Sequence, residues 1–364
     1  IYWSQVISGV ADTRILDGVE MASGNIALVG AAKPTGVAFH SCYLAVSDLS
    51  GLLKWAHLAG GSQASSCHNV TRSAAGSLVA VGSIASGNSP CSVGLFLSAT
   101  PDGSAITTVE VPAPNPYNCL SLTGVAALNG GDVVVSGTID HFPGSRGFVG
   151  RIDPTGASVW SHTWESEGSL FRDVCAAPDQ SSIVAGVRGN VESRKLFLVR
   201  YSEQGDVLWS KDGAEVTDLE LVSVACLANG GSVAVGTKNS LLADSVAEVV
   251  RLDPDGNELW ETEVHAWDSL WVRDIVFHEG GVLLAGAVTA LPYFDNRQAW
   301  MGRLDAMGES EWAGHLEEPY GLLTALPVVS GTTMIAVGDR GKYPALGMSG
   351  WLVSSSLEMV CESE

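Results

Sequence analysis

The sequence repeats itself at a spacing of about fifty residues. Each copy contains a short apolar run that ends in glycine, and the steps between successive copies are 52, 55, 49, 50, 50 and 52 residues. A period of this length is too long for a solenoid turn and is typical of a four-stranded propeller blade. We therefore expect an all-β fold: a seven-bladed β-propeller with four antiparallel strands per blade. The marker glycines are Gly30, Gly82, Gly137, Gly186, Gly236, Gly286 and Gly338.

Turn and strand signals follow one another in the same order within each copy. A tight turn such as Asn129–Gly131 precedes the apolar strand, because hairpins need residues that tolerate a positive φ. A third strand then leads to a second turn, such as Asp253–Gly256, and to a fourth strand. Tryptophan recurs at one position of the fourth strand, which predicts a common packing slot. These residues are Trp55, Trp160, Trp209, Trp260 and Trp312.

The two ends of the chain complete the count of strands. The segment Ile1–Ser4 is similar to the fourth strand around Val207–Ser210, and the last copy ends soon after its third strand, Trp351–Ser354. We therefore expect residues 1 to about 8 to supply the outer strand of the last blade and to close the ring. The repeats run without a linker, which predicts one domain over residues 1–364.

These features resemble those of a known family. An apolar strand that ends in glycine, followed by the segment Arg251–Trp260, is similar to bacterial exported seven-bladed propeller repeats, whose blades end in a glycine turn and Leu-Trp. The resemblance covers essentially the whole chain, although no tryptophan follows the turn Thr100–Gly103 of the second copy. It implies the fold and a secreted or cell-surface location, periplasmic or extracellular, and it implies no defined reaction.

Acidic residues outnumber basic residues by 40 to 19, so the formal net charge is −21 at pH 7. Such a surface repels phosphate backbones and anionic lipid head groups. No run approaches the roughly eighteen apolar residues of a membrane span. We therefore expect no nucleic-acid partner, no membrane insertion and a monomer. The chain begins at Ile1 within a strand pattern and without an initiator methionine, so we also expect a signal peptide upstream.

The cysteine spacing contains no CxxC pair and no Cys/His set, so we predict no metal site. In a propeller, the loop between the second and third strands lies on the same face as the loop between blades. This geometry places Cys42 near Cys67 and Cys91 near Cys119, and it predicts two disulfides in an oxidising compartment. The alternative is that these four cysteines stay reduced.

The other three cysteines have no partner in this scheme. Cys175 and Cys226 fall at small-residue positions of first strands, where we expect buried thiols. The role of Cys361 stays open.

The mouth of the central channel, where the first strands begin, is the expected ligand site. Counting back from the marker glycines places three aspartates around this opening, with basic and aromatic residues beside them. Such a mixture is able to bind a carbohydrate, a cation or a protein partner, and no cofactor is expected. The alternative is structural, because aspartate at a strand start often accepts backbone hydrogen bonds. The candidate residues are Asp17, His68, Asn69, Arg172, Asp173, Trp271, Arg273 and Asp274.

Arginine also repeats, on the third strands, where repetition at a blade-building position favours pairing between blades or a solvated face over catalysis. These residues are Arg151, Arg200, Arg251 and Arg303.

No GxSxG elbow, phosphate loop or dinucleotide fingerprint occurs. We therefore favour a non-enzymatic binding or scaffold module that recognises a ligand or protein partner through the channel mouth and the face with the two predicted disulfides. The alternative is a hydrolase or lyase that acts on a polysaccharide or small metabolite with Asp17, Asp173 and Asp274 as its carboxylates. A structural surface protein without a ligand is the third possibility, so enzymatic activity is left open.

Overall fold

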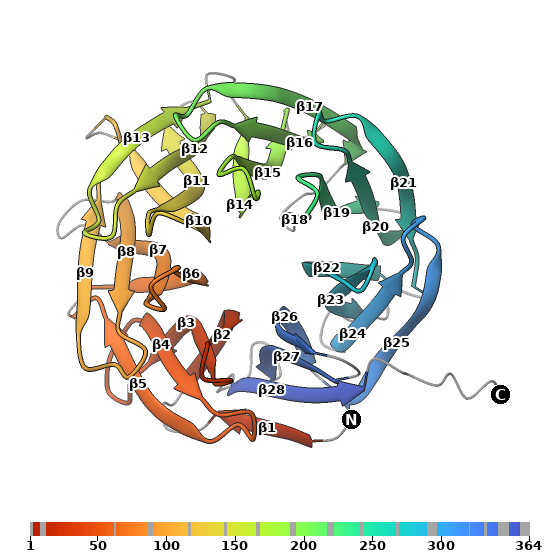
Figure 1. Cartoon of the computed structure of the whole chain (residues 1–364). Coiled ribbons are helices and arrows are strands. Elements are labelled where there is room, and N and C mark those ends of the chain that lie inside the picture. The colour runs from red at the N-terminus through yellow and green to blue at the C-terminus, as the bar shows by residue number, and fades with distance from the viewer. Residues whose placement is uncertain are drawn as a thin grey trace.

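The chain forms seven four-stranded antiparallel sheets arranged as a ring (Figure 1). Neighbouring sheets lie side by side around the ring, with the first strand of each sheet innermost and the fourth strand outermost. Among the described residues, no helix is long and apolar enough to cross a membrane. The computed structural model describes residues 3–7, 12–61, 63–85, 91–115, 118–141, 144–164, 168–189, 194–216, 222–240, 243–266, 269–289, 297–319, 321–330, 333–340 and 349–356.

Six of the sheets are blades of four strands that follow one another in the chain. The first blade contains β2 (Asp12–Glu20), β3 (Ile26–Lys33), β4 (Ser41–Ser47) and β5 (Leu53–Ala59). The second contains β6 (Ser65–Arg72), β7 (Leu78–Ala85), β8 (Ser92–Ala99) and β9 (Ile106–Val111). The third contains β10 (Cys119–Ala127), β11 (Val133–His141), β12 (Gly144–Ile152) and β13 (Ser158–Thr163).

The next three blades have the same order. The fourth contains β14 (Leu170–Ala176), β15 (Ser182–Arg188), β16 (Arg194–Tyr201) and β17 (Val207–Val216). The fifth contains β18 (Val222–Cys226), β19 (Ser232–Ser240), β20 (Ala243–Leu252) and β21 (Glu258–Val264). The sixth contains β22 (Ser269–His278), β23 (Gly281–Thr289), β24 (Arg297–Leu304) and β25 (Ser310–Pro319).

The seventh sheet is assembled from both ends of the chain, in the order β1-β28-β27-β26. Trp3 pairs with Ser354 and Ile7 with Gly350, so β1 lies beside β28 in Figure 1. The ladder between β26 and β27 slips twice, the second time next to Pro327, which has no N–H to donate. Its strands are β26 (Gly321–Ser330), β27 (Thr333–Arg340), β28 (Ser349–Ser356) and β1 (Trp3–Ile7).

The expectation of seven equivalent blades is therefore corrected. Six sheets are blades of consecutive strands, whereas the seventh is a composite sheet with an irregular inner ladder. The irregularity has a local cause, because a proline within a strand removes one hydrogen bond of the ladder.

The hydrophobic core lies between neighbouring sheets. The side chains of β3 and β4 are buried along nearly their whole length. Leu44 and Val46 of the first blade belong to one cluster with Leu95 and Leu97 of the second. Outer strands such as β5 are more exposed. Where their burial is described, the middle strands therefore bury both faces, which explains why they are apolar runs rather than alternating patterns.

The marker glycines are explained by a bulge in the first strand, which six of the seven sheets have and β18 of the fifth blade lacks in its described residues. In β2 the register slips between Ile15 and Asp17, which pushes the backbone toward β3. A Cβ atom on Gly30 would lie 1.8 Å from the carbonyl oxygen of Arg14, so no other residue fits there. The same close approach, at 1.9–2.2 Å, occurs at five further marker glycines of the described residues: Gly82, Gly137, Gly186, Gly286 and Gly338.

The repeated tryptophan packs against the turn of the next blade. Trp209 donates its Nε1 hydrogen bond to the carbonyl oxygen of Pro254 at 3.0 Å. Gly256 of that turn has a φ of +81°, and a Cβ atom on it would lie 2.9 Å from the indole. The second blade has no tryptophan, and Val109 contacts Gly156 instead. The common packing slot is therefore a contact between blades at the outer rim.

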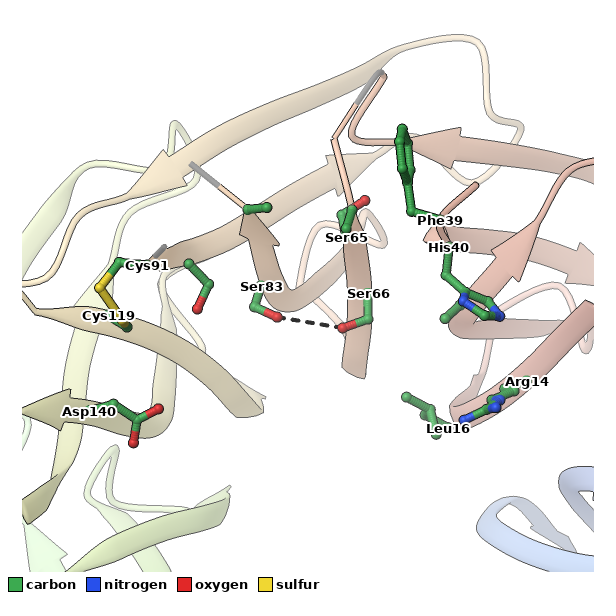
Figure 2. Close-up of a pocket in the computed structure, with 14 residues that line it drawn as sticks. Arg14, Leu16, Phe39, His40, Ser65, Ser66, Ser83, Cys91, Cys119 and Asp140 are labelled. Carbon is green, nitrogen blue, oxygen red and sulfur yellow. Dashed lines mark hydrogen bonds between the residues drawn. A yellow bond between two sulfur atoms is a disulfide. The ribbon is translucent and has the colours of Figure 1, made fainter. Parts of the chain in front are cut away.

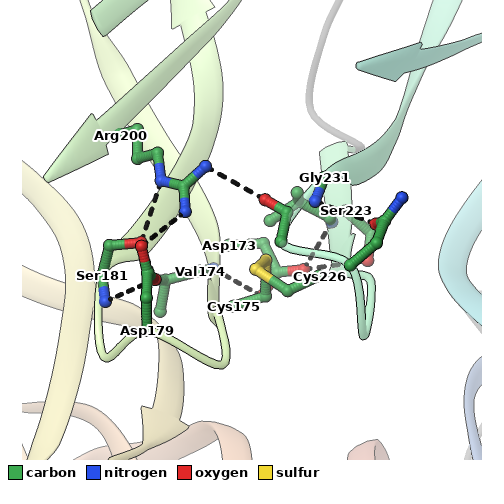
Figure 3. Close-up of a disulfide and its surroundings, with 12 residues drawn as sticks. Asp173, Val174, Cys175, Asp179, Ser181, Arg200, Ser223, Cys226 and Gly231 are labelled. Carbon is green, nitrogen blue, oxygen red and sulfur yellow. Dashed lines mark hydrogen bonds and ion pairs between the residues drawn. A yellow bond between two sulfur atoms is a disulfide. The ribbon is translucent and has the colours of Figure 1, made fainter. Parts of the chain in front are cut away.

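Three disulfides link neighbouring blades in the described part of the chain. The predicted bonds Cys42–Cys67 and Cys91–Cys119 are both confirmed. The expectation of buried thiols at Cys175 and Cys226 is wrong, because these residues form a third disulfide (Figure 3).

The third disulfide has a simple geometric cause. The two cysteines are 51 residues apart, which is about one repeat, so they occupy matching positions of β14 and β18. The Cα atoms of the two cysteines are 5.5 Å apart. Three disulfides indicate an oxidising environment. Cys361 lies outside the described residues.

Three of the four repeated arginines connect neighbouring blades, which is one of the two roles expected for them. Arg200 donates from Nη1 to the carbonyl oxygen of Pro254 in the next blade, at 2.5 Å. Arg151 and Arg251 make the same kind of contact with the turns of their next blades, at 3.1 and 2.8 Å. Arg303 pairs instead with a glutamate of its own sheet.

Candidate functional site

The first strands surround a cavity of about 320 Å³ in the centre of the ring. Seven of the eight residues proposed from the sequence line it, and Trp271 does not. The lining residues come from β2, β6, β14 and β22, with contributions from the intervening blades. Seven of the residues chosen from the sequence therefore gather around one opening. The seven residues are Asp17, His68, Asn69, Arg172, Asp173, Arg273 and Asp274.

The bulges decide which side chains reach this cavity. His68, Arg172 and Arg273 are the extra residues where the registers of β6, β14 and β22 slip. An extra residue re-aims the side chains on either side of it, so that two consecutive residues line the cavity. An alternating strand without a bulge would show only one of them.

The residues that follow the bulges connect each first strand to the next blade. Asp17 accepts a hydrogen bond from the backbone N–H of Val70, with 2.7 Å between Oδ2 and N. Asn69 accepts one from the N–H of Val125 at 3.0 Å. Both contacts cross from one blade to its neighbour and provide an acceptor for a backbone N–H of the neighbouring first strand.

The same contact recurs in the later blades. Asp173 accepts from the N–H of Val224 at 2.9 Å, and Asp274 accepts from the N–H of Leu326 at 2.7 Å. The second oxygen of each aspartate accepts the N–H of the residue that follows it, at 2.8 Å in both cases. Ser223 lies between the two aspartates and donates to Asp173 at 2.8 Å. Both oxygens of these carboxylates are therefore engaged by backbone donors.

Three junctions of the ring are made differently. Between the fifth and sixth blades, the hydroxyl of Ser223 donates to Asp274 at 3.4 Å. At Gly124 the next blade comes so close that a Cβ atom would lie 2.9 Å from the Cα atom of Asp173. Between the seventh sheet and the first blade, Asp339 accepts from the N–H of Ile15 at 2.6 Å. Asp339 was not among the sequence candidates. Its signal in the sequence is a carboxylate directly after a marker glycine.

Burial and mutual repulsion make these carboxyl groups weak acids. Burial raises the pKa of Asp17 well above its ordinary value, and the charge of Asp274 adds to the rise. Burial likewise raises the pKa of Asp173, and it raises that of Asp274 to about 6. The pKa of Asp339 rises to about 7, again through burial, although three arginines oppose the rise. No described set of three or more His, Cys, Asp or Glu side chains is placed to hold a metal ion.

His68 is held as a neutral imidazole. Its Nδ1 lies 2.8 Å from the carbonyl oxygen of Leu122, which only accepts, so Nδ1 carries the proton. Its Nε2 then accepts from the hydroxyl of Ser66 at 2.7 Å. Burial lowers the pKa of His68, and the positive charge of Arg172 lowers it further.

A second cavity, of about 710 Å³, adjoins the first and is lined in part by the Cys91–Cys119 disulfide (Figure 2). Leu16 lines both cavities, and Ser66 in the larger one is bonded to His68 in the smaller one. Arg14 and Phe39 lie on one side of the larger cavity, and the disulfide of Cys91 lies on the other. Because these walls come from three different blades, the cavity could not be predicted from the sequence.

Comparisons with known proteins identify the fold. No family model matches the chain, and no curated protein matches it in sequence. The chain is similar to the acylaminoacyl peptidase of Pyrococcus horikoshii, with a TM-score of 0.55 and 9% identity over 93% of this chain and 51% of that one. It thus spans about half the length of that peptidase.

Two further structures match over nearly the full length of both chains. The β-propeller domain of the Trilobed protease from Pyrococcus furiosus gives a TM-score of 0.55 at 8% identity, over 96% of this chain and 98% of that one. The chain is a β-propeller. A polysaccharide lyase gives a TM-score of 0.58 at 8% identity, over 97% of this chain and 91% of that one. At such identities the likeness concerns the fold alone, because propellers carry unrelated activities.

Proposed function

We propose that this propeller is an exported, non-enzymatic binding module whose site is the channel mouth together with the adjoining 710 Å³ cavity. One observation carries the proposal: the aspartates that an acid–base enzyme would need are already used as acceptors between blades. Asp173 and Asp274 have both oxygens engaged by backbone N–H groups. A carboxylate in that state is not available for a proton transfer to substrate.

Export and the kinship with bacterial exported propeller repeats are part of the same proposal. Three disulfides between blades are typical of proteins from oxidising compartments. The repeat resembles that of bacterial exported propeller proteins, and the net charge of −21 suits a protein without a nucleic-acid partner. We propose that the module acts as a monomer and takes a carbohydrate or a protein partner.

The two disulfides on this face support a binding role. Cys67 continues directly into the bulge of β6, and Cys119 lies in the wall of the larger cavity. Bonds that hold loops in one geometry reduce the entropy lost when a ligand binds. A preorganised pocket of several hundred cubic ångströms has the size of a ligand site.

A thermal-shift screen of glycans, organic acids and short peptides tests the proposal, because a ligand of the folded state raises the apparent melting temperature. Each hit is repeated on Ser83→Phe, which fills the larger cavity, and on Ser98→Phe, a matched change on β8 outside both cavities. We expect the shift to disappear in the first variant and to persist in the second. Ligands that raise the melting temperature of Ser83→Phe as much as that of the wild type would contradict a site in the larger cavity.

One specific observation favours a second candidate function, that of a hydrolase whose catalytic residues are not the three aspartates. The hydroxyl of Ser66 donates to neutral His68, and the carbonyl of Leu122 fixes the imidazole. This is the arrangement that activates a serine nucleophile, since the imidazole takes the hydroxyl proton as the oxygen attacks a carbonyl carbon. The leaving group then receives that proton, and water releases the acyl group from Ser66.

A fluorophosphonate probe separates the two candidates. In a hydrolase, the oxygen of Ser66 displaces fluoride from phosphorus, and mass spectrometry finds one adduct on that residue. The labelling disappears in Ser66→Ala and His68→Gln and persists in Ser92→Ala, whose hydroxyl bonds to a backbone carbonyl. A protein that remains unlabelled while still binding ligands is the binding module of the first proposal.

A further inference from the structure

The walls of the larger cavity differ in charge, and this difference points to the ligand. Arg14 lies on one side and Asp140 on the opposite side (Figure 2). The Nε of Arg14 is buried and has no hydrogen-bond partner among the described residues. Asp140 is exposed and accepts a hydrogen bond from Ser145 at 2.8 Å. A ligand that spans the cavity therefore meets a cationic donor at one end and an anionic acceptor at the other.

Several arginines gather near the Arg14 end, where the carboxylate of Asp12 is paired with His40 at 3.0 Å. Arg14, Arg273 and Arg297 all act on the single buried carboxyl of Asp339. One carboxyl group cannot neutralise three guanidinium groups, and burial also raises its pKa to about 7. Arg172 adds a further positive charge beside His68 in the adjoining cavity. Guanidinium groups bind carboxylates with paired, charge-assisted hydrogen bonds.

The remaining walls suit hydroxyl groups and an apolar ring face. Ser66 and Ser83 present hydroxyls 3.5 Å apart, and hydroxyls both donate and accept. Phe39 is half-buried at the same cavity and offers an aromatic face. The carboxylate of Asp140 accepts hydroxyl donors and repels a second anion. A polyphosphate or a densely charged polymer is therefore disfavoured, all the more by the net charge of −21.

Resting on the proposed binding function, we infer that the ligand is a carbohydrate with sparse carboxylate groups, such as an oligosaccharide containing one uronic acid. Its carboxylate binds Arg14, and its hydroxyl groups bind the serines and Asp140. Phe39 packs against a sugar ring. A cavity of about 710 Å³ holds a short oligosaccharide rather than a single sugar.

Matched sugar pairs test the inference by isothermal titration calorimetry. The pairs are cellobiose with cellobiouronic acid and galactobiose with digalacturonic acid, which differ mainly by carboxylate for hydroxymethyl. Trialanine supplies a carboxylate without sugar hydroxyls. We expect at least one acid to bind tenfold more tightly than its neutral partner and than trialanine. Arg14→Gln should weaken the binding of that acid at least tenfold. Arg72→Gln should leave the binding unchanged, because Arg72 lies at the end of β6 that is far from the cavity residue Ser66.

The outcomes separate this inference from the proposed function. Equal binding of acid and neutral sugars, with loss in Ser83→Phe, overturns the carboxylate assignment and keeps the binding site. Tighter binding of trialanine than of either acid assigns the site to a peptide partner and overturns the carbohydrate. No binding of any sugar, with thermal-shift hits of another class that Ser83→Phe abolishes, also overturns it. Arg172→Gln serves as the second variant if Arg14→Gln lowers the melting temperature of the free protein.

Discussion

At the residue scale, polar side chains of the inner strands hold neighbouring blades together. Asp17, Asn69, Asp173 and Asp274 each accept a backbone N–H from the following blade. Three of the four are carboxylates whose pKa values are raised by burial. The ring therefore satisfies its backbone donors with groups that resist ionisation in this environment.

Asn69 tests this role without a change of charge. Asn69→Ala leaves the N–H of Val125 unpaired, which lowers the free energy of unfolding by about 1–3 kcal/mol. Asn69→Asp keeps an acceptor, as three other blades do, and should be close to the wild type at pH 5. Urea unfolding of the three proteins measures both effects. An alanine variant as stable as the wild type would mean that the contact between blades contributes nothing.

Asp339 makes the stability depend on pH. Its folded pKa of about 7 lies above its unfolded value of about 3.9, so the folded protein binds more protons between these values. This contribution to stability is complete at low pH and is lost as the pH rises through about 7. Asp339→Asn keeps an oxygen for the N–H of Ile15 and removes the titration. The decrease in unfolding free energy from pH 5 to pH 8 should then shrink by roughly 2 kcal/mol.

Asp253 provides the control for that measurement. Hydrogen bonds with Asn257 lower its pKa, so it stays ionised in both states across this pH range. Asp253→Asn should shift stability equally at pH 5 and pH 8. If Asp339→Asn leaves the pH dependence of the wild type intact, the carboxyl is ionised throughout and the assignment is wrong.

At the element scale, a blade is defined by two glycine positions with different causes. The marker glycine lies opposite a bulge, where a backbone carbonyl leaves no room for a Cβ atom. The turn glycine has a positive φ and also receives the tryptophan of the preceding blade. The turns therefore contribute to the packing between blades, as the apolar strands do.

A pair of glycine variants separates turn strain from packing. Gly76 and Gly256 have similar φ values, +86° and +81°, but nothing lies within 4 Å of a Cβ atom on Gly76. Gly76→Ala should cost about 1–2 kcal/mol of strain. Gly256→Ala should cost about 1 kcal/mol more, because it displaces Trp209 and its hydrogen bond to Pro254. Urea unfolding followed by tryptophan fluorescence measures the difference, and equal losses would show that the slot contributes no stability.

Features that recur in every blade could be predicted from the sequence, because repetition separates them from chance. The order of strands and turns and the position of the channel mouth are of this kind. The loop geometry that the blades share also predicted the disulfides of Cys42 and Cys91. Properties that depend on the direction of a side chain could not be predicted from the sequence. The bulge beside Asp173 turns its oxygens toward the next blade, and Cys175 looks like a buried thiol until its match one repeat later is considered. The cavity beside Arg14 joins residues from three blades.

At the scale of the whole molecule, the ring depends on one junction that is not repeated elsewhere. Inner hydrogen bonds, disulfides and tryptophan contacts join consecutive blades, whereas β1 alone adds a fourth strand to β26, β27 and β28. Without it, β28 would present an unpaired edge, which is a template for aggregation. Closure by β1 therefore protects the molecule as well as completing the sheet.

Engineered cysteines test this closure directly, in a background with Cys361→Ser. Ser4 pairs with Val353, so Ser4→Cys with Val353→Cys should form a disulfide under mild oxidation. Because that bond closes a loop of nearly the whole chain, the chain-entropy model predicts a gain of about 6 kcal/mol in the free energy of unfolding. Ser4→Cys with Gly350→Cys is the control, since Gly350 pairs with Ile7, roughly 10 Å along the strand. Thiol titration and peptide mapping measure how much of each disulfide forms. Equal cross-linking of the two pairs would mean that β1 pairs in another register or does not join the sheet. The ring would then be open at this junction.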